Sequence, residues 1–128
     1  MRIAFAQIFV TDQDAAKAFY TEKLGFVERT DAAYGPGARW LTVASPDDQE
    51  GPELLLGLPD EDARAFQKHV HDAGQPAMSF TTDDIQGDYE RLRAAGVAFT
   101  LPPTTMEYGG TDAIFEDTCG NLVNLHQG

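Results

Sequence analysis

The chain alternates short apolar segments with polar connections that are rich in glycine, proline and aspartate. The alternating stretch over 3–9, with Ile3, Phe5, Gln7 and Phe9 on one face, predicts a strand. Asp12 can then cap a helix that ends at Gly25. The residues expected to face the core from this helix are Ala15, Ala16, Phe19 and Tyr20. Apolar segments over 26–29, 39–44 and 53–56 predict three more strands, so the order is strand, helix, strand, strand, strand.

The second half of the chain repeats this pattern. Residues 78–81 predict a strand, Asp83 or Asp84 caps a helix that ends at Gly96, and strands are expected over 97–101, 112–115 and 122–126. Residues with helical spacing on one face are Ile85, Tyr89 and Leu92. A shift of 71 residues superimposes the following pairs: Phe9 on Phe80, Thr11 on Thr82, Asp12 on Asp83, Gly25 on Gly96 and Leu54 on Leu125. This repeat predicts two tandem βαβββ modules.

A linker helix is expected between the two copies. Its apolar residues are Ala63, Phe66, Val70 and Ala73, and Gly74 is its expected stop. We therefore expect one α+β domain over 1–128, with a first module over about 1–58, a linker helix over about 60–74 and a second module over about 75–128. One such module cannot cover both faces of its own sheet, so the two modules are expected to form a curved mixed sheet around a cavity.

Composition and charge narrow the possible partners. The 128 residues include 9 Lys and Arg against 21 Asp and Glu, a net charge of −12 that repels nucleic acid and anionic membranes. No charged and then apolar leader precedes the first strand, and no apolar run approaches the roughly 20 residues that span a bilayer. We expect a soluble cytoplasmic protein. The single cysteine, Cys119, is expected to be a small turn residue rather than a nucleophile.

Several segments together resemble the vicinal oxygen chelate superfamily, which includes glyoxalases, bleomycin resistance proteins and extradiol dioxygenases. The segments are Phe19-Tyr20, Leu24-Gly25-Phe26, Thr82-Asp83-Asp84-Ile85, Leu92, Gly96-Val97, a Pro102-Pro103 loop, Tyr108-Gly109 and the run from Phe115 to Leu122. The resemblance covers essentially the whole chain and implies the glyoxalase/bleomycin resistance fold. Because this superfamily includes isomerases, lyases, dioxygenases and drug-binding proteins, the resemblance implies a scaffold and leaves the reaction open.

The same resemblance implies where a divalent metal would bind. Metal-using members take a ligand from the first and the last strand of each module, and the matching positions here are Phe5, Glu53, Ala77 and Asn124. Glu53 alone is a strong ligand, whereas a catalytic metal generally needs about three protein ligands. We therefore expect no cofactor. An irregular divalent-metal site built from Gln7, Glu53 and His126 stays open as an alternative.

Strand alternation also predicts a ligand site. The residues expected to line it are Phe5, Gln7, Phe9, Trp40, Leu55 and Asn124. Aromatic walls with a few polar groups suit a small, partly apolar organic molecule. This predicts a small-molecule binding protein with a degenerate metal site that works as a homodimer, because a two-fold partner could cover the open sheet faces and edges.

An enzyme would use the same residues differently. Glu53, partly desolvated by its aromatic neighbours, could act as a general base, with His126 or Tyr108 as the acid. A metal-dependent lyase, isomerase or dioxygenase is the other enzymatic alternative. If instead Glu53 is the relic of a ligand position, we expect it to hydrogen-bond to Asn124 or Gln7.

Overall fold

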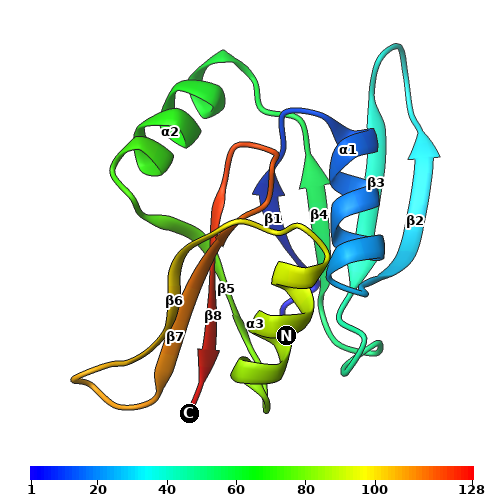
Figure 1. Ribbon diagram of the computed structural model, residues 1–128. Coiled ribbons are helices and arrows are strands. Elements are labelled where there is room, and N and C mark those ends of the chain that lie inside the picture. The colour runs from blue at the N-terminus through cyan, green and yellow to red at the C-terminus, as the bar shows by residue number, and fades with distance from the viewer. The chain divides into compact units, whose positions relative to one another are not determined.

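The computed structural model describes residues 1–128 and divides them into two compact units, Met1–Arg64 and Ala65–Gly128. The elements are β1 (Phe5–Phe9), α1 (Gln13–Ala18), the π-helical turn η1 (Phe19–Lys23), β2 (Val27–Ala33), β3 (Arg39–Ala44), β4 (Glu53–Gly57), α2 (Glu61–Asp72), β5 (Pro76–Thr81), α3 (Ile85–Ala94), β6 (Phe99–Thr105), β7 (Thr111–Glu116) and β8 (Leu122–Gln127) (Figure 1). This order confirms the α+β class and the two βαβββ repeats. Hydrogen bonding groups the strands into two separate four-stranded sheets.

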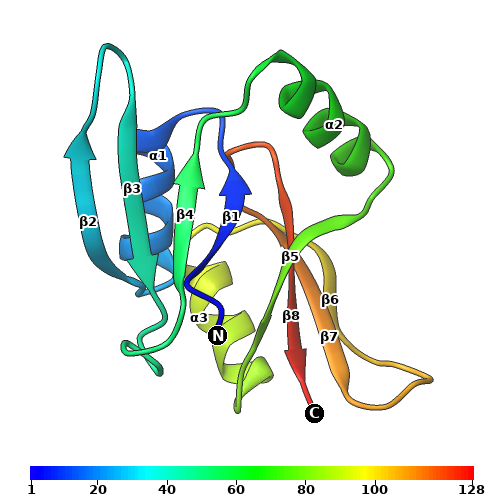
Figure 2. The same ribbon diagram turned by 180° about the vertical axis from the view of Figure 1, so that it is seen from behind.

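The first sheet has the strand order β1-β4-β3-β2, with β1 parallel to β4 and the other pairs antiparallel. Helix α1 covers one of its faces, and the strands lie in front of that helix in Figure 2. Leu41, Val43 and Leu56 are buried on the α1 side, as alternation along β3 and β4 requires. The opposite face is therefore the one available for function.

Helix α1 begins at the expected cap. The Asp12 carboxylate accepts a hydrogen bond from the backbone N–H of Ala15 at 3.0 Å. Ala16, Phe19 and Tyr20 are buried, as predicted, but Ala15 is exposed, so its prediction as a core residue was wrong. The face of α1 turned to the core carries Gln13 and Ala16, three residues apart, and Ala15 lies outside it.

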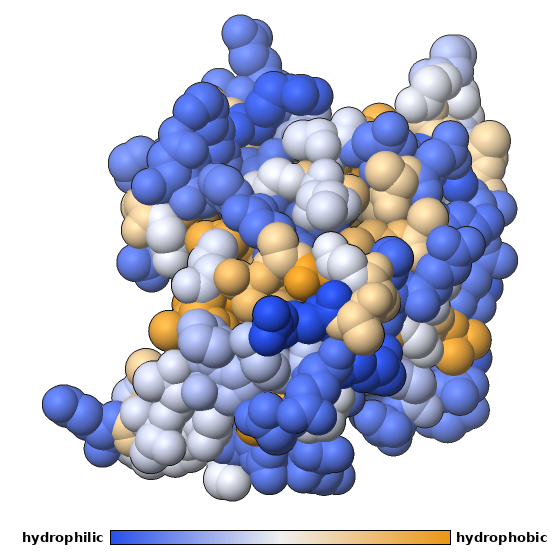
Figure 3. All heavy atoms as spheres, in the orientation of Figure 1, coloured by the Kyte–Doolittle hydropathy of each residue, from blue (hydrophilic) through white to orange (hydrophobic).

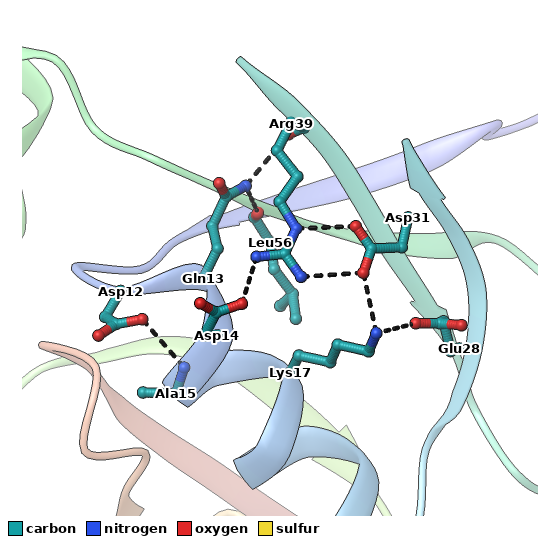
Figure 4. A network of polar contacts seen from close by, with 9 residues as sticks. All are labelled: Asp12, Gln13, Asp14, Ala15, Lys17, Glu28, Asp31, Arg39 and Leu56. Carbon is teal, nitrogen blue, oxygen red and sulfur yellow. Dashed lines mark hydrogen bonds and ion pairs between the residues drawn. The ribbon is translucent and has the colours of Figure 1, made fainter. Parts of the chain in front are cut away.

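Charged side chains join α1 to strands β2 and β3 of the first sheet (Figure 4). Arg39 on β3 donates to Asp14 at 2.6 Å and to both oxygens of Asp31 at 2.7 and 2.9 Å. Lys17 pairs with Asp31 and with Glu28 on β2. Hydrogen bonds from Arg39 and then Lys17 hold the pKa of Asp31 well below its usual range. This exposed network orients α1 on the sheet and leaves the opposite face free of it.

The second sheet has the order β5-β8-β7-β6, and β5 is parallel to β8. Asp84 rather than Asp83 caps α3, because its carboxylate accepts the N–H of Gly87 at 3.0 Å. Ile85 and Leu92 are buried, and the ring of Tyr89 packs against Phe99 of β6 at 4.7 Å between centroids. The predicted apolar face of this helix is therefore confirmed.

The Pro102-Pro103 segment lies inside β6, so the expectation of a loop there was wrong. Strand β6 is the edge of its sheet, and its pairing with β7 shifts between Phe99 and Leu101 and again between Leu101 and Thr104. An edge strand with irregular pairing tolerates proline because the missing N–H groups are not needed for the sheet.

Helix α2 turns a different face inward from the one expected. Phe66 is 67% exposed, whereas Gln67 is buried. The Gln67 side-chain amide donates at 3.2 Å to both the carbonyl of Cys119 and the side-chain oxygen of Asn121. The surface over α2 is mainly hydrophilic (Figure 3). A polar residue replaces the expected apolar one because it satisfies backbone and side-chain groups of the turn beneath it.

The turn between β7 and β8 is organised by Asp117, which is fully buried. One carboxylate oxygen accepts the backbone N–H groups of Cys119 and Asn121 at 2.7 and 3.0 Å, and the other accepts the side-chain amide of Asn121 at 2.7 Å. Cys119 is buried, in keeping with its expected role as a turn residue. None of the helices is both long enough and apolar enough to cross a membrane.

The pairing of His71 on α2 with Glu116 on β7 should make stability depend on pH. The His71 Nε2 lies 3.0 Å from both Glu116 oxygens, and this hydrogen bond raises the pKa of His71 above 6.5. Because the pKa of His71 is higher in the folded state than in the unfolded state, the pair stabilises the fold fully at pH values below the unfolded-state pKa. This stabilisation is lost as the pH rises through the folded-state pKa. Both side chains are about one-third exposed, so the contribution should stay below about 1 kcal/mol. Urea unfolding should show that wild type and His71→Gln differ in free energy of unfolding at pH 5.5 but not at pH 8.5. Equal differences at the two pH values would contradict this prediction.

Candidate functional site

The sheet face opposite α1 brings together the site residues predicted from the first module. Residues directly across neighbouring strands share a face, and the register pairs Phe5 with Glu53 and Gln7 with Leu55. Thr42 pairs with Leu55 from the other side. The residues on this face of β1, β3 and β4 are Phe5, Gln7, Phe9, Trp40, Thr42, Glu53 and Leu55.

Three aromatic side chains form what we term the aromatic cluster: Phe5, Tyr34 and Trp40. The Phe5 and Trp40 rings meet edge to face with 5.4 Å between centroids and 83° between planes. Tyr34, in the β2–β3 hairpin, lies 6.5 Å from Trp40. The exposed fractions are 45% for Phe5, 58% for Tyr34 and 36% for Trp40, which is unusual for large aromatic residues at one place. Sequence reasoning missed Tyr34, which lies in the segment between the strands predicted over 26–29 and 39–44.

Glu53 is paired differently from the expectation. The Thr42 hydroxyl donates to one Glu53 carboxylate oxygen at 2.6 Å, so neither Asn124 nor Gln7 is the partner in this bond. Thr42 is buried and Glu53 is half-buried, which fixes the carboxylate beside the aromatic cluster. Its second oxygen remains available as an acceptor for a polar group of a ligand. Sequence reasoning missed Thr42 because a threonine in an apolar strand resembles an ordinary strand residue.

The second unit carries a separate group of polar side chains on the sheet face opposite α3. We term it the polar cluster, and its residues are Ser79, Tyr108, Asp112, Asn124 and His126. Asp112 pairs across the strands with His126, and Ser79 with Asn124. His126 Nδ1 lies 2.5 Å from one Asp112 oxygen, the Tyr108 hydroxyl donates to the other, and the Asn124 amide donates to the Ser79 hydroxyl at 2.9 Å.

Asp112 is the centre of the polar cluster, and sequence reasoning missed it. Burial opposes ionisation of its carboxyl group, but hydrogen bonds from Tyr108 and His126 hold its pKa below the usual value. The same hydrogen bond to Asp112 raises the pKa of Tyr108. Strand alternation could have indicated Asp112, because it is the first residue of a strand predicted to lie beside the strand that carries Asn124 and His126.

The metal positions implied by the fold do not assemble a ligand set. In the structure Asn124 lies opposite Ser79 on β5 rather than opposite Ala77. Neither of these two β5 residues adds a strong ligand. Of the residues at these positions, Glu53 alone carries a charged oxygen.

The alternative metal site also lacks a full set of strong ligands. No group of three or more His, Cys, Asp or Glu side chains could hold a metal ion. In the set of Gln7, Glu53 and His126, the histidine Nδ1 is engaged by Asp112, so its Nε2 alone is open for coordination. Glu53 with the neutral amide of Gln7 falls short of the about three strong protein ligands that a catalytic metal generally needs.

Comparison with known proteins gives a consistent result. The family model described as "Glyoxalase/Bleomycin resistance protein/Dioxygenase superfamily" matches residues 2–125. YurT of Bacillus subtilis (strain 168) is 50% identical, covering 99% of both chains. The crystal structure of UcmS2 matches with a TM-score of 0.83 and 37% identity, covering 98% of this chain and 97% of that one. TnmS3, described as an antibiotic binding protein from Streptomyces sp. CB03234, matches with a TM-score of 0.78 and 29% identity, covering 99% and 95%.

Proposed function

The chain belongs to the glyoxalase/bleomycin resistance protein/dioxygenase superfamily, and within it we propose that this protein binds a small, partly aromatic organic molecule without a resident metal ion. The observation that carries the proposal is the aromatic cluster next to the Glu53 carboxylate on the sheet face opposite α1. Aromatic rings left exposed around one half-buried acceptor are typical of sites for flat organic ligands. The similarity to TnmS3, an antibiotic binding protein, supports the same class of ligand.

The proposed ligand contacts are of two kinds, packing against aromatic rings and hydrogen bonding to polar side chains. Phe5 and Trp40 offer ring surfaces that a planar ligand can stack on or meet edge to face. Glu53, held by Thr42, accepts a hydrogen bond from a ligand hydroxyl or amine and sets its orientation. Gln7 contributes an amide on the same face, next to Gly57, where a Cβ would lie 2.6 Å from the Gln7 nitrogen. A glycine at position 57 therefore leaves the space that the Gln7 side chain occupies.

A metal-free enzyme is the second candidate, because the same Glu53 carboxylate is half-buried and adjacent to the proposed ligand position. Substitution by glutamine separates the two functions. The glutamine side chain would keep an oxygen that accepts from Thr42 but would lose the charge and the ability to take a proton. For a binding protein we expect Glu53→Gln to weaken affinity by about tenfold or less, whereas a general base should cost about 10²-fold or more in turnover while binding persists.

The experiment is a screen of aromatic and carbonyl compounds by fluorescence of Trp40, the single tryptophan, in wild type and Glu53→Gln. The protein is first dialysed against a chelator. Saturable quenching with unchanged compound, and a modest affinity loss in the variant, is the expected result. Compound turnover that Glu53→Gln abolishes would favour the enzyme. A stoichiometric nickel, zinc, iron or manganese ion that survives the chelator would contradict the metal-free proposal and favour a metal-dependent lyase or dioxygenase.

We also propose that the working unit is a cytoplasmic homodimer. In each sheet the two outer strands, β1 and β2 or β5 and β6, have one edge without a partner in their own sheet. Unpaired edges and open faces are commonly covered by a two-fold partner that uses the same surface on each subunit. Light scattering in moderate salt should therefore give a molar mass near twice the 14.0 kDa of one chain, and a mass of one chain at micromolar concentration would reject the dimer.

A further inference from the structure

The polar cluster of the second unit contains a histidine, His126, whose orientation is fixed by a residue on the neighbouring strand. His126 on β8 and Asp112 on β7 are direct cross-strand partners, and Nδ1 of the ring lies 2.5 Å from the Asp112 carboxylate. Asp112 is 6% exposed, while about a third of the His126 side chain remains accessible. The contact with Asp112 occupies Nδ1 and leaves Nε2 as the ring nitrogen that can take a second partner.

The Asp112 carboxylate is saturated with donors. Besides His126 it accepts the Tyr108 hydroxyl, so each of its two oxygens has a partner, which favours its ionised form. An ionised carboxylate can only accept, so the proton of the neutral imidazole must be on Nδ1. His126 Nε2 then carries a lone pair and acts as a hydrogen-bond acceptor.

The backbone next to His126 is shaped to admit the ring. Gly110 precedes β7 with φ +76°, in the left-handed region that favours glycine. A Cβ at this position would lie 2.6 Å from the His126 Cε1 and 3.2 Å from Nε2. Any larger residue would displace the imidazole, so Gly110 and Asp112 fix its position from two sides.

We propose that His126, oriented by Asp112, is a second binding position that accepts a hydrogen bond from a weakly acidic hydroxyl group, a phenol or an enol. The inference rests on the proposed binding of small organic molecules and adds the chemical class of the group recognised. A hydroxyl that donates to Nε2 gains a partner, whereas the corresponding methyl ether has no proton to offer and leaves the lone pair unsatisfied. Asp112 is a positioning residue here, because it acts through the ring of His126.

The test uses two fluorescent probes that differ in this one group, the phenol umbelliferone and its methyl ether herniarin. Fluorescence anisotropy should show that the wild-type protein binds the phenol about tenfold more tightly than the ether. His126→Asn keeps an amide that can donate to Asp112 in place of Nδ1 but has no group at the position of Nε2, so both probes should bind it equally. His69→Gln, which removes an exposed histidine from α2, is the matched control and should keep the tenfold preference.

Asp112→Asn tests whether Asp112 sets the position of the proton on the His126 ring, which a purely structural role would leave unchanged. The asparagine amide can donate to Nδ1 and so drive the imidazole proton to Nε2, which would remove the acceptor and with it the preference for the phenol. Nitrogen NMR of the histidine ring in the free protein should show the Nδ1–H form in wild type and the Nε2–H form or a mixture in Asp112→Asn. This NMR comparison of wild type with Asp112→Asn needs no bound ligand.

Four results would overturn the inference. The first three are equal affinity of the wild type for the two probes, a preference that survives in His126→Asn, and a wild-type ring without the Nδ1–H form. The fourth is that neither probe binds. The wider binding proposal fails on a separate observation, namely that no compound in the Trp40 screen gives saturable quenching.

Discussion

Replacing Asp117 by alanine is expected to lower the free energy of unfolding by about 3 kcal/mol or more, a large loss for a small domain. The Asp117 carboxylate is fully buried and accepts two backbone N–H groups and one side-chain amide in the β7–β8 turn. Alanine would leave these donors buried without partners, and each unsatisfied donor costs about 1–3 kcal/mol. The turn also receives Gln67 of α2, so its disruption should loosen that helix from the second sheet.

Urea unfolding followed by circular dichroism measures this loss. Asp83→Ala is a matched control, because it removes the same charge from an exposed position next to the α3 cap and should change stability by less than about 0.5 kcal/mol. Asp117→Asn should fall between the two, since its amide keeps one acceptor oxygen but opposes the donor of Asn121. Equal stability of Asp117→Ala and Asp83→Ala would show that the turn does not depend on the buried carboxylate.

Replacing Phe5 by alanine is expected to weaken binding of an aromatic ligand by about 30-fold, the effect of losing one aromatic anchor worth about 2 kcal/mol. The Phe5 ring braces Trp40 edge to face and shares its exposed surface. Because Phe5 is already 45% exposed, the variant should lose little stability. Trp40 is retained, so its fluorescence still reports binding of any compound found in the screen.

Phe66→Ala is the control for Phe5→Ala. Phe66 is an aromatic residue on α2 that is 67% exposed, outside the aromatic cluster. Its removal should leave the dissociation constant within about twofold of wild type. Similar affinities for Phe5→Ala and wild type would mean that the aromatic cluster does not bind the ligand.

Local sequence signals predicted most of the fold. Alternating apolar positions indicated the strands, and Asp12, Gly25 and Gly96 marked helix ends, because capping and left-handed glycines act within a few residues. The 71-residue repeat predicted the tandem modules. Register was harder, since the bulge between Pro76 and Met78 is set by pairing with β8 and has no clear mark in β5 itself.

The face of α2 could not be predicted from hydrophobic spacing. Phe66 fits an apolar stripe, yet Gln67 is the buried residue because it satisfies a turn more than 50 residues away in the chain. Such long-range hydrogen bonds leave no local pattern. The same limit applied to the Glu53–Thr42 and His126–Asp112 pairs, where one member was predicted and its partner on the next strand was not.

The central claim is that the face of the first sheet carrying Phe5, Trp40 and Glu53 binds a small aromatic molecule without a metal. NMR titration of the chelator-treated protein with the tightest compound from the screen tests it most directly. We expect saturable shifts of the Trp40 indole N–H and of the Phe5 and Glu53 amides, with one dissociation constant shared by all three. Saturable binding that leaves these three signals unmoved, or shifts that require an added divalent metal, would contradict it.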